Sequence, residues 1–136
     1  MSLSKVKILE LPKILDERGN LSFLEEGKQI PFEIKRTYWI YDVPGGETRG
    51  GHSYKENQEI IIALSGSFDV VLNDGFDSKV VSLNRSYYGI YVPSGIWRHM
   101  ENFSTNALAM IISSTYFDAN DYIREFEEYK GETLKV

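Results

Sequence analysis

The chain contains no cysteine and only two histidines among its 136 residues. The absence of cysteine excludes disulfide bonds and thiolate metal ligands. No apolar run approaches the roughly 18 residues that a membrane-spanning helix needs, and the first residues lack the apolar stretch of a signal peptide. These absences predict a cytoplasmic protein that has no membrane partner.

Blocks of like charge are also absent, and the formal net charge is −5. This balance argues against an extended phosphate-binding surface for DNA or RNA, although a few local arginines can still bind one small anion. Hydrophobic residues make up 42% and charged residues 26% of the chain, as in ordinary globular proteins. The length fits a single domain over residues 1–136, with one apolar core.

The remaining composition favours strands. Aromatic residues make up 13%, and Gly or Pro recurs at short intervals, which is typical of a many-stranded β fold. Alternating or apolar segments predict strands over Ile34–Asp42, Gly51–Tyr54, Glu59–Leu64, Ser67–Asn73, Lys79–Leu83, Gly89–Val92, Trp97–Glu101 and Leu108–Ser114. Ser65-Gly66 and Asn73-Asp74-Gly75 are predicted to be tight turns, the first of them a hairpin.

The C-terminal part of the chain has a different pattern. Asp118 and Asp121 offer capping side chains, and Ile123, Phe126 and Tyr129 follow at roughly helical spacing. We therefore predict a short helix over Tyr122–Tyr129 that closes one end of the strands. The fold class is all-β, an antiparallel β-barrel or sandwich with a short C-terminal helix.

One stretch carries a pattern of polar residues with a chemical meaning. His52, Tyr54, Glu59 and Gly66, followed by Arg98 near Gly95, have the spacing of a cupin metal motif from which two of the four ligands are missing. Arginine cannot coordinate a cation, and His99 lies one position further along a strand, on the opposite face. The pattern predicts a cupin-type jelly-roll barrel whose site binds no metal.

His52 is the main candidate for chemistry, because an imidazole that titrates at about pH 6.5 can both accept and release a proton near neutral pH. A packed structural histidine is the alternative interpretation. Tyr54 and Tyr38 are candidates to donate to a substrate oxygen, and core packing is their alternative. Arginines suit a diphosphate and a rim aromatic such as Trp97 suits a base or sugar face, although a solvated surface charge is the usual role of a single arginine.

Short motifs along almost the whole chain resemble one family. They are Asp16-Glu-Arg-Gly19, Ile30-Pro-Phe32, Ile34-Lys-Arg36 with Tyr38, Arg49-Gly-Gly-His52, Lys55, Leu64-Ser-Gly66, Asn73-Asp-Gly75, Leu83, Gly89-Ile-Tyr-Val-Pro93, Trp97, Asn102-Phe-Ser104, Tyr116-Phe-Asp118 and Asp121-Tyr-Ile-Arg124. As an ordered set they resemble the WxcM-like sugar nucleotide 3,4-ketoisomerases of the cupin superfamily.

The resemblance implies conversion of dTDP-4-oxo-6-deoxyglucose into a dTDP-3-oxo-6-deoxyhexose through an enediol, without a cofactor, in a homodimer with N-terminal strands exchanged between the two copies. His52 matches the family's catalytic imidazole, with Tyr54 and Tyr38 beside it. The residues expected to bind the dTDP-linked 4-oxo-6-deoxyhexose are Arg18, Arg36, Arg49, Lys55, Glu59, Trp97, Arg98 and Asn102.

Two positions depart from the family pattern. The family usually has a second histidine where this chain has Tyr54, and glutamine is common where Glu59 stands. A carboxylate at position 59 would raise the proton affinity of a touching imidazole. Arg18 and Arg98 are expected to influence which face of carbon 4 is protonated, and both the galacto and the gluco product stay open. A non-catalytic dTDP-sugar-binding cupin and a 3,5-epimerase-like enzyme are the alternatives.

Overall fold

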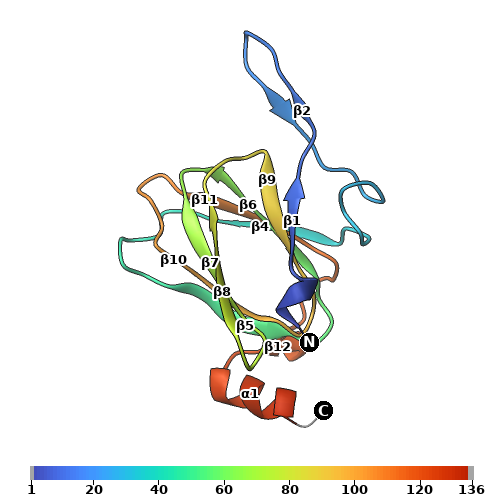
Figure 1. The fold of residues 1–136 in the computed structure, drawn as a ribbon, viewed down its shortest axis with the longest axis vertical. Coiled ribbons are helices and arrows are strands. Elements are labelled where there is room, and N and C mark those ends of the chain that lie inside the picture. Colours follow the sequence, from blue (N-terminus) through green and yellow to red (C-terminus); the bar gives the residue numbers. More distant parts are fainter. Residues whose placement is uncertain (1, 135–136) are drawn as a thin grey trace.

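Two five-stranded β-sheets face each other across an apolar core in the computed structural model, which describes residues 2–134. A two-stranded hairpin projects from the body at one end, and a short helix lies at the other (Figure 1). All pairings between the named strands are antiparallel, which confirms the predicted all-β class. The sheets are not hydrogen-bonded to each other as a closed barrel.

The strands follow the predicted segments closely. The first sheet has the order β1 (Lys7–Glu10), β9 (Tyr88–Val92), β6 (Glu59–Ser65), β11 (Leu108–Ser113) and β4 (Arg36–Ile40). The second has the order β12 (Tyr122–Ile123), β5 (Arg49–Tyr54), β10 (Trp97–Glu101), β7 (Phe68–Asn73) and β8 (Ser78–Leu83). The hairpin is β2 (Lys13–Ile14) with β3 (Leu21–Ser22), and the helices are η1 (Leu3–Lys5), η2 (Ala119–Asp121) and α1 (Phe126–Leu134).

The core is made by the inward faces of alternating strands. In β7, Phe68, Val70 and Leu72 are buried, while the residues between them are partly exposed. Ile61 of β6 and Ile111 of β11 meet them from the first sheet. This period of two is the geometric consequence of side chains pointing to opposite faces along a strand. Each fully buried aliphatic side chain contributes about 1.5–3 kcal/mol by leaving water.

Strand β6 is buried on both faces. Ile60 and Ile62 point away from the main core and are still inaccessible to solvent. Leu11, Ile30 and Phe32 of the N-terminal segment cover them in a second apolar cluster. The N-terminal segment therefore covers the outer face of the first sheet, while the inner face of that sheet packs in the main core.

The predicted helix over Tyr122–Tyr129 begins too early. Tyr122 and Ile123 form β12 and pair with β5, and α1 spans Phe126–Leu134. Edge pairing with a strand far away in the sequence outweighs the local helical spacing, and Ile123 is buried by it. The helix does cover one end of the sheets, because the Tyr129 hydroxyl donates to the carbonyl oxygens of Asn73 and Gly95.

The hairpin predicted at Ser65-Gly66 is wrong, although a turn is present. Strand β6 belongs to the first sheet and β7 to the second, so this turn crosses from one sheet to the other. Gly66 has a φ of 65°, and a Cβ there would meet the side chain of Ser104 and the backbone of Ala107. The turn at Asn73-Asp74-Gly75 does join a paired hairpin, β7–β8.

No helix within residues 2–134 is long and apolar enough to cross a membrane.

Candidate active site

A pocket of about 480 Å³ contains His52. Its walls come from β4, the start of β5, β10 and the C-terminal segment around β12. The lining residues are Arg36, Tyr38, Trp39, Ile40, Arg49, Gly50, His52, Arg98, Phe117, Tyr122 and Arg124. Sequence segments that are far apart thus converge on one histidine.

His52 lies deep in this pocket with an unpartnered ring nitrogen. Its side chain is buried, and Nε2 has no hydrogen-bond partner among the described residues. The rings of Tyr54 and Tyr122 pack edge-on against the imidazole, at centroid distances of 4.6 and 4.9 Å. Burial, together with the positive charges of Arg98, Arg124 and Arg36, lowers the pKa of His52 to about 2. The imidazole is therefore neutral, which leaves a nitrogen lone pair free to accept a proton.

Arg98 and Glu59 form a buried ion pair beside His52. Arg98 pairs with His52 across β10 and β5, and only 1% of either Arg98 or Glu59 is exposed. The Nε and Nη2 groups of Arg98 donate to the two carboxylate oxygens of Glu59 at 2.9 and 3.0 Å. Burial alone would lower the pKa of Arg98, but the carboxylate of Glu59 raises it, so the guanidinium stays charged.

The Glu59 carboxylate is not a partner of His52, contrary to the idea that it raises the proton affinity of an imidazole. Its hydrogen bonds go to Arg98 and to the Tyr38 hydroxyl, which donates at 2.6 Å. The pKa of His52 is lowered rather than raised, first by burial and then by the positive charges around it. Glu59 thus acts on the pocket through Arg98 and Tyr38.

A β-bulge at Gly50 shapes the wall beside Arg98. The β5–β10 register shifts between Arg98 and Met100, and Gly50 has a φ of 69°. The Gly50 carbonyl oxygen accepts a hydrogen bond from Nη1 of Arg98 at 2.9 Å. A Cβ at position 50 would collide with that same nitrogen. Glycine is therefore required here both by the backbone conformation and by the close approach of the guanidinium.

Three tyrosine hydroxyls form a chain along one side of the pocket. The Tyr54 hydroxyl donates to that of Tyr122 at 3.3 Å and lies 3.4 Å from that of Tyr38. Tyr54 itself is 4% exposed and does not line the pocket, whereas Tyr38 and Tyr122 do. Burial, reinforced by the charge of Glu59, raises the pKa of both Tyr38 and Tyr54, so their hydroxyls keep their protons.

Uncompensated cations surround the pocket mouth. Arg36, Arg49 and Arg124 line it, and no carboxylate within the described range lies in salt-bridge distance of them. Arg124 stacks over the Tyr122 ring, with Cζ 4.0 Å from the centroid. Because the chain as a whole carries a net charge of −5, this local excess of positive charge favours an anionic ligand.

Five of the predicted site residues line the pocket, and two more lie directly behind it. The lining residues are His52, Tyr38, Arg36, Arg49 and Arg98, and the two behind them are Tyr54 and Glu59.

The structure does not bring the other four to this pocket. Trp97 is buried against Phe126 and Tyr129 on the helix side of β10. Asn102 is exposed in a turn with a φ of 57° and donates to Asp69. Arg18 lies between β2 and β3 in the projecting hairpin, where it pairs with Asp16.

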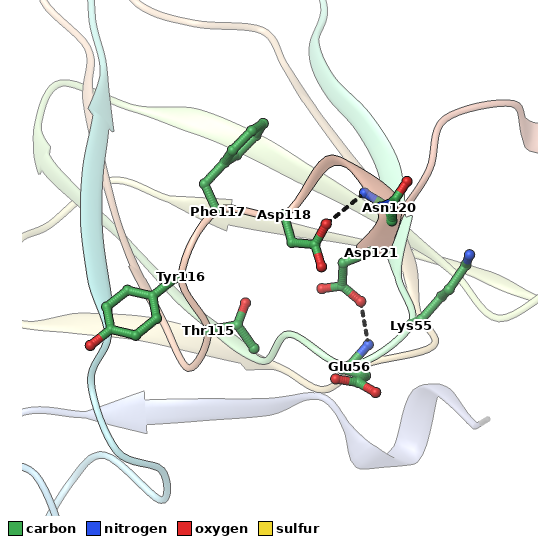
Figure 2. A pocket seen from close by; sticks show the side chains of 8 residues that line it. All are labelled: Lys55, Glu56, Thr115, Tyr116, Phe117, Asp118, Asn120 and Asp121. Carbon is green, nitrogen blue, oxygen red and sulfur yellow. Dashed lines mark hydrogen bonds between the residues drawn. The ribbon is translucent and has the colours of Figure 1, made fainter.

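Lys55 lines a neighbouring pocket of about 460 Å³, drawn in Figure 2. Two of the three carboxylates that line this second pocket bind backbone amides: Asp118 accepts from the amide of Asn120, and Asp121 accepts from those of Glu56 and Asn57. These contacts fix the loop between β11 and β12. The second pocket is therefore explained by the structural role of its acidic side chains.

Six lining residues were not among the predicted site residues: Trp39, Ile40, Gly50, Phe117, Tyr122 and Arg124. Trp39 is 59% exposed and supplies the rim indole that had been expected from Trp97. Arg124 and Tyr122 stand in a motif that had been recognised, Asp121-Tyr-Ile-Arg124. The helix predicted for that segment gives the wrong directions for their side chains, so they were not placed in the pocket. The motif could therefore have identified both residues if the segment had been predicted to be a strand.

The side chains that line the pocket are suited to proton transfer on an anionic substrate. Among residues 2–134, no group of three or more His, Cys, Asp or Glu side chains is placed to hold a metal ion. A neutral imidazole, a fixed guanidinium and several hydroxyls instead converge on one cavity. Such groups can move protons and stabilise developing oxyanions.

Comparison with known proteins gives consistent results. Residues 4–133 match the family model described as FdtA, WxcM-like, C-terminal. The chain is 38% identical over 130 residues to TDP-4-oxo-6-deoxy-alpha-D-glucose-3,4-oxoisomerase of Aneurinibacillus thermoaerophilus. The aligned region covers 96% of this chain and 94% of that protein.

Solved structures of 3,4-ketoisomerases superpose closely on this chain. A 3,4-ketoisomerase from Helicobacter canadensis superposes with a TM-score of 0.93 at 40% identity, covering 96% of this chain and 98% of the other. QdtA, a sugar 3,4-ketoisomerase from Thermoanaerobacterium thermosaccharolyticum solved with TDP, gives a TM-score of 0.95 at 34% identity and covers 98% of each chain. A histidine-to-asparagine mutant of QdtA was solved with TDP-4-keto-6-deoxyglucose. A 3,5-epimerase from Bacillus anthracis, at 17% identity and a TM-score of 0.79, shares the cupin-like fold.

Proposed function

Because the chain belongs to the FdtA, WxcM-like family of sugar nucleotide 3,4-ketoisomerases, we propose that its pocket converts dTDP-4-oxo-6-deoxyglucose into a dTDP-3-oxo-6-deoxyhexose. The chain is thus an isomerase, and its substrate class follows from its relatives. The observation that carries the proposal is the neutral, unpartnered imidazole of His52 at the floor of a cationic pocket.

The reaction moves a carbonyl group between neighbouring carbons. A proton leaves carbon 3, an enediol forms, and a proton arrives at carbon 4. One base on one face of the sugar can perform both transfers, because the two carbons are adjacent. His52 is the only imidazole that lines the pocket in the described part of the chain, and its free Nε2 makes it the base.

Substrate binding would strengthen this base. The charges of Arg98, Arg124 and Arg36 contribute to the low pKa of His52. A diphosphate held by Arg36, Arg49 and Arg124 would offset part of this positive charge. The imidazolium formed during the reaction would then be less unfavourable than in the empty pocket.

Arg98 would hold the developing oxyanion. Its five N–H groups make four hydrogen bonds, two to Glu59 and one each to Gly50 and Tyr38. One N–H on Nη1 remains for a substrate oxygen. A donor that is fixed in place before the reaction stabilises negative charge without reorganisation, an effect worth about 3–4 kcal/mol in comparable sites.

We further propose that the chain acts as a homodimer whose hairpin packs on the second copy. Ile14, Leu15 and Leu21 of the β2–β3 hairpin are 56%, 73% and 54% exposed, although they are aliphatic. A projecting apolar arm of this kind usually packs on a partner. Dimerisation would carry Arg18 toward the partner's pocket. Light scattering should give twice the monomer mass, and Leu21→Asp should shift it to the monomer; a wild-type monomer would exclude the arrangement.

Incubation with dTDP-4-oxo-6-deoxyglucose in heavy water tests the reaction. NMR should show a 3-oxo product with deuterium on the isomerised carbon. His52→Asn should abolish conversion and retain TDP binding, whereas His99→Asn, on the opposite face of β10, should convert at the wild-type rate. Conversion retained in His52→Asn would remove that residue from the role of base.

Two other outcomes would select other functions. TDP binding without any exchange would indicate a binding protein. Inversion of configuration without migration of the carbonyl group would indicate an epimerase.

A further inference from the structure

Moving the carbonyl group requires a second proton transfer, between oxygens. The hydroxyl on carbon 3 must lose its proton, and the carbonyl oxygen on carbon 4 must gain one. His52 accounts for the carbon-bound hydrogen, so this inference, which rests on the proposed function, concerns the group that serves the two oxygens. That group must line the pocket and have a hydrogen that no protein atom accepts.

Tyr122 meets both conditions. It lines the pocket, and its hydroxyl oxygen accepts the hydrogen of Tyr54 at 3.3 Å. Within residues 2–134, no hydrogen bond is donated by the Tyr122 hydroxyl itself. The phenol O–H is therefore available to a ligand in the cavity.

The hydroxyl groups of Tyr38 and Tyr54 already donate their hydrogens within the protein. Tyr38 lines the pocket, but its hydrogen goes to Glu59 at 2.6 Å and its oxygen accepts from Arg98 at 3.0 Å. Tyr54 is buried behind the pocket and gives its hydrogen to Tyr122. Tyr38 thus positions Arg98, and Tyr54 positions Tyr122.

The placement of Tyr122 beside His52 is also suitable. The two rings lie edge-on with centroids 4.9 Å apart, so a sugar carbon that contacts the imidazole has its oxygens near the phenol. Arg124 stacks on the Tyr122 ring at 4.0 Å and β12 pairs with β5, which together hold the phenol in place.

We propose that Tyr122 is the catalytic residue that carries the proton between the two substrate oxygens, while His52 carries the one between the two carbons. Tyr122 donates to the oxygen on carbon 4 as His52 takes the hydrogen from carbon 3. His52 then protonates carbon 4 as Tyr122 takes back the proton from the oxygen on carbon 3. One C–H and one O–H bond break and one of each forms, and both residues return to their starting states.

The test is Tyr122→Phe, with Tyr41→Phe as the matched control. Tyr41 is 62% exposed and lies outside this pocket, so its loss of a hydroxyl should leave kcat unchanged. Tyr122→Phe keeps the ring stacking and should lower kcat about 100-fold with KM within about threefold, since general acid–base groups contribute about 10²–10⁴. Because the buried Tyr54 hydroxyl loses its acceptor at a cost of about 1–3 kcal/mol, the melting temperature should fall by no more than about 10 °C, and the variant stays folded at the assay temperature.

A kcat for Tyr122→Phe within threefold of wild type would overturn this role, as would a rise in KM alone. If Tyr122→Phe does not fold, Tyr54→Phe removes the donor to the Tyr122 oxygen and should lower kcat about tenfold; an unchanged kcat would count against the proposal. A wild-type protein that fails to isomerise the substrate would overturn the proposed function as well. Wild-type turnover with an unaffected Tyr122→Phe would overturn the role of Tyr122 alone.

Discussion

Replacing the Glu59 carboxylate by a neutral side chain should destabilise the protein strongly, because the buried guanidinium of Arg98 cannot reach water. Arg98 and Glu59 are each 1% exposed, and the carboxylate accepts two hydrogen bonds from the guanidinium. In Glu59→Gln the guanidinium stays charged and buried while its counter-charge is gone. Breaking one side of a buried ion pair costs about 3–5 kcal/mol.

The corresponding change in melting temperature follows from chain length. An unfolding entropy of about 2.1 cal/mol/K per residue gives roughly 0.29 kcal/mol/K for 136 residues. A loss of about 3–5 kcal/mol therefore lowers the melting temperature by about 10–17 °C. Differential scanning calorimetry and urea titration would measure both quantities.

The matched control is Glu101→Gln. Glu101 contacts His99 at 2.7 Å, but its side chain is 46% exposed, so its pair is worth less than about 1 kcal/mol. The double variant Glu59→Leu with Arg98→Met should recover much of the lost stability, because it also removes the buried guanidinium charge. A loss below about 1 kcal/mol in Glu59→Gln would show that the pair is not desolvated, and the reasoning would fail.

Two further predictions concern the same wall of the pocket. Since the pKa of His52 is about 2 in the folded protein and about 6.5 when unfolded, the unfolded chain alone binds this proton, and stability should fall by about 1.4 kcal/mol for each pH unit below 6.5. Urea unfolding at pH 7 and pH 5 should show this loss in wild type and its absence in His52→Asn; equal losses would mean that His52 is not held neutral. Gly50→Ala places a side chain against Nη1 of Arg98 at a φ of 69°, so it should cost more than about 1 kcal/mol and reduce kcat. Calorimetry and steady-state kinetics of Gly50→Ala would check this, and a variant indistinguishable from wild type would count against a fixed guanidinium.

Local patterns predicted most of the fold. The alternation in Arg36–Ile40 depends only on side chains pointing to opposite faces of one strand, so the sequence is sufficient to predict it. The failures are non-local. The turn at Ser65-Gly66 is encoded locally, but the sheet that the next strand joins is decided by β10 and β8.

The candidate site shows the same division. The cupin-type motif predicted that His52 and Arg98 lie together, and they do, on strands that pair directly. Tyr122 was assigned to a helix, since its pairing with Tyr54 depends on a contact far away in the chain. The position of Arg18 could not be predicted from sequence spacing, because its hairpin projects from the body of the protein (Figure 1).

The attachment of β12 to β5 has a consequence for the order in which the site can assemble. Every strand of the two sheets except β12 precedes residue 122 in the chain. The two sheets can therefore close around their apolar interior while one wall of the cavity is still missing. Docking of the two-residue strand β12 on β5, with α1 held by the Tyr129 hydroxyl, is then the step that brings Tyr122 and Arg124 into the pocket and completes its wall.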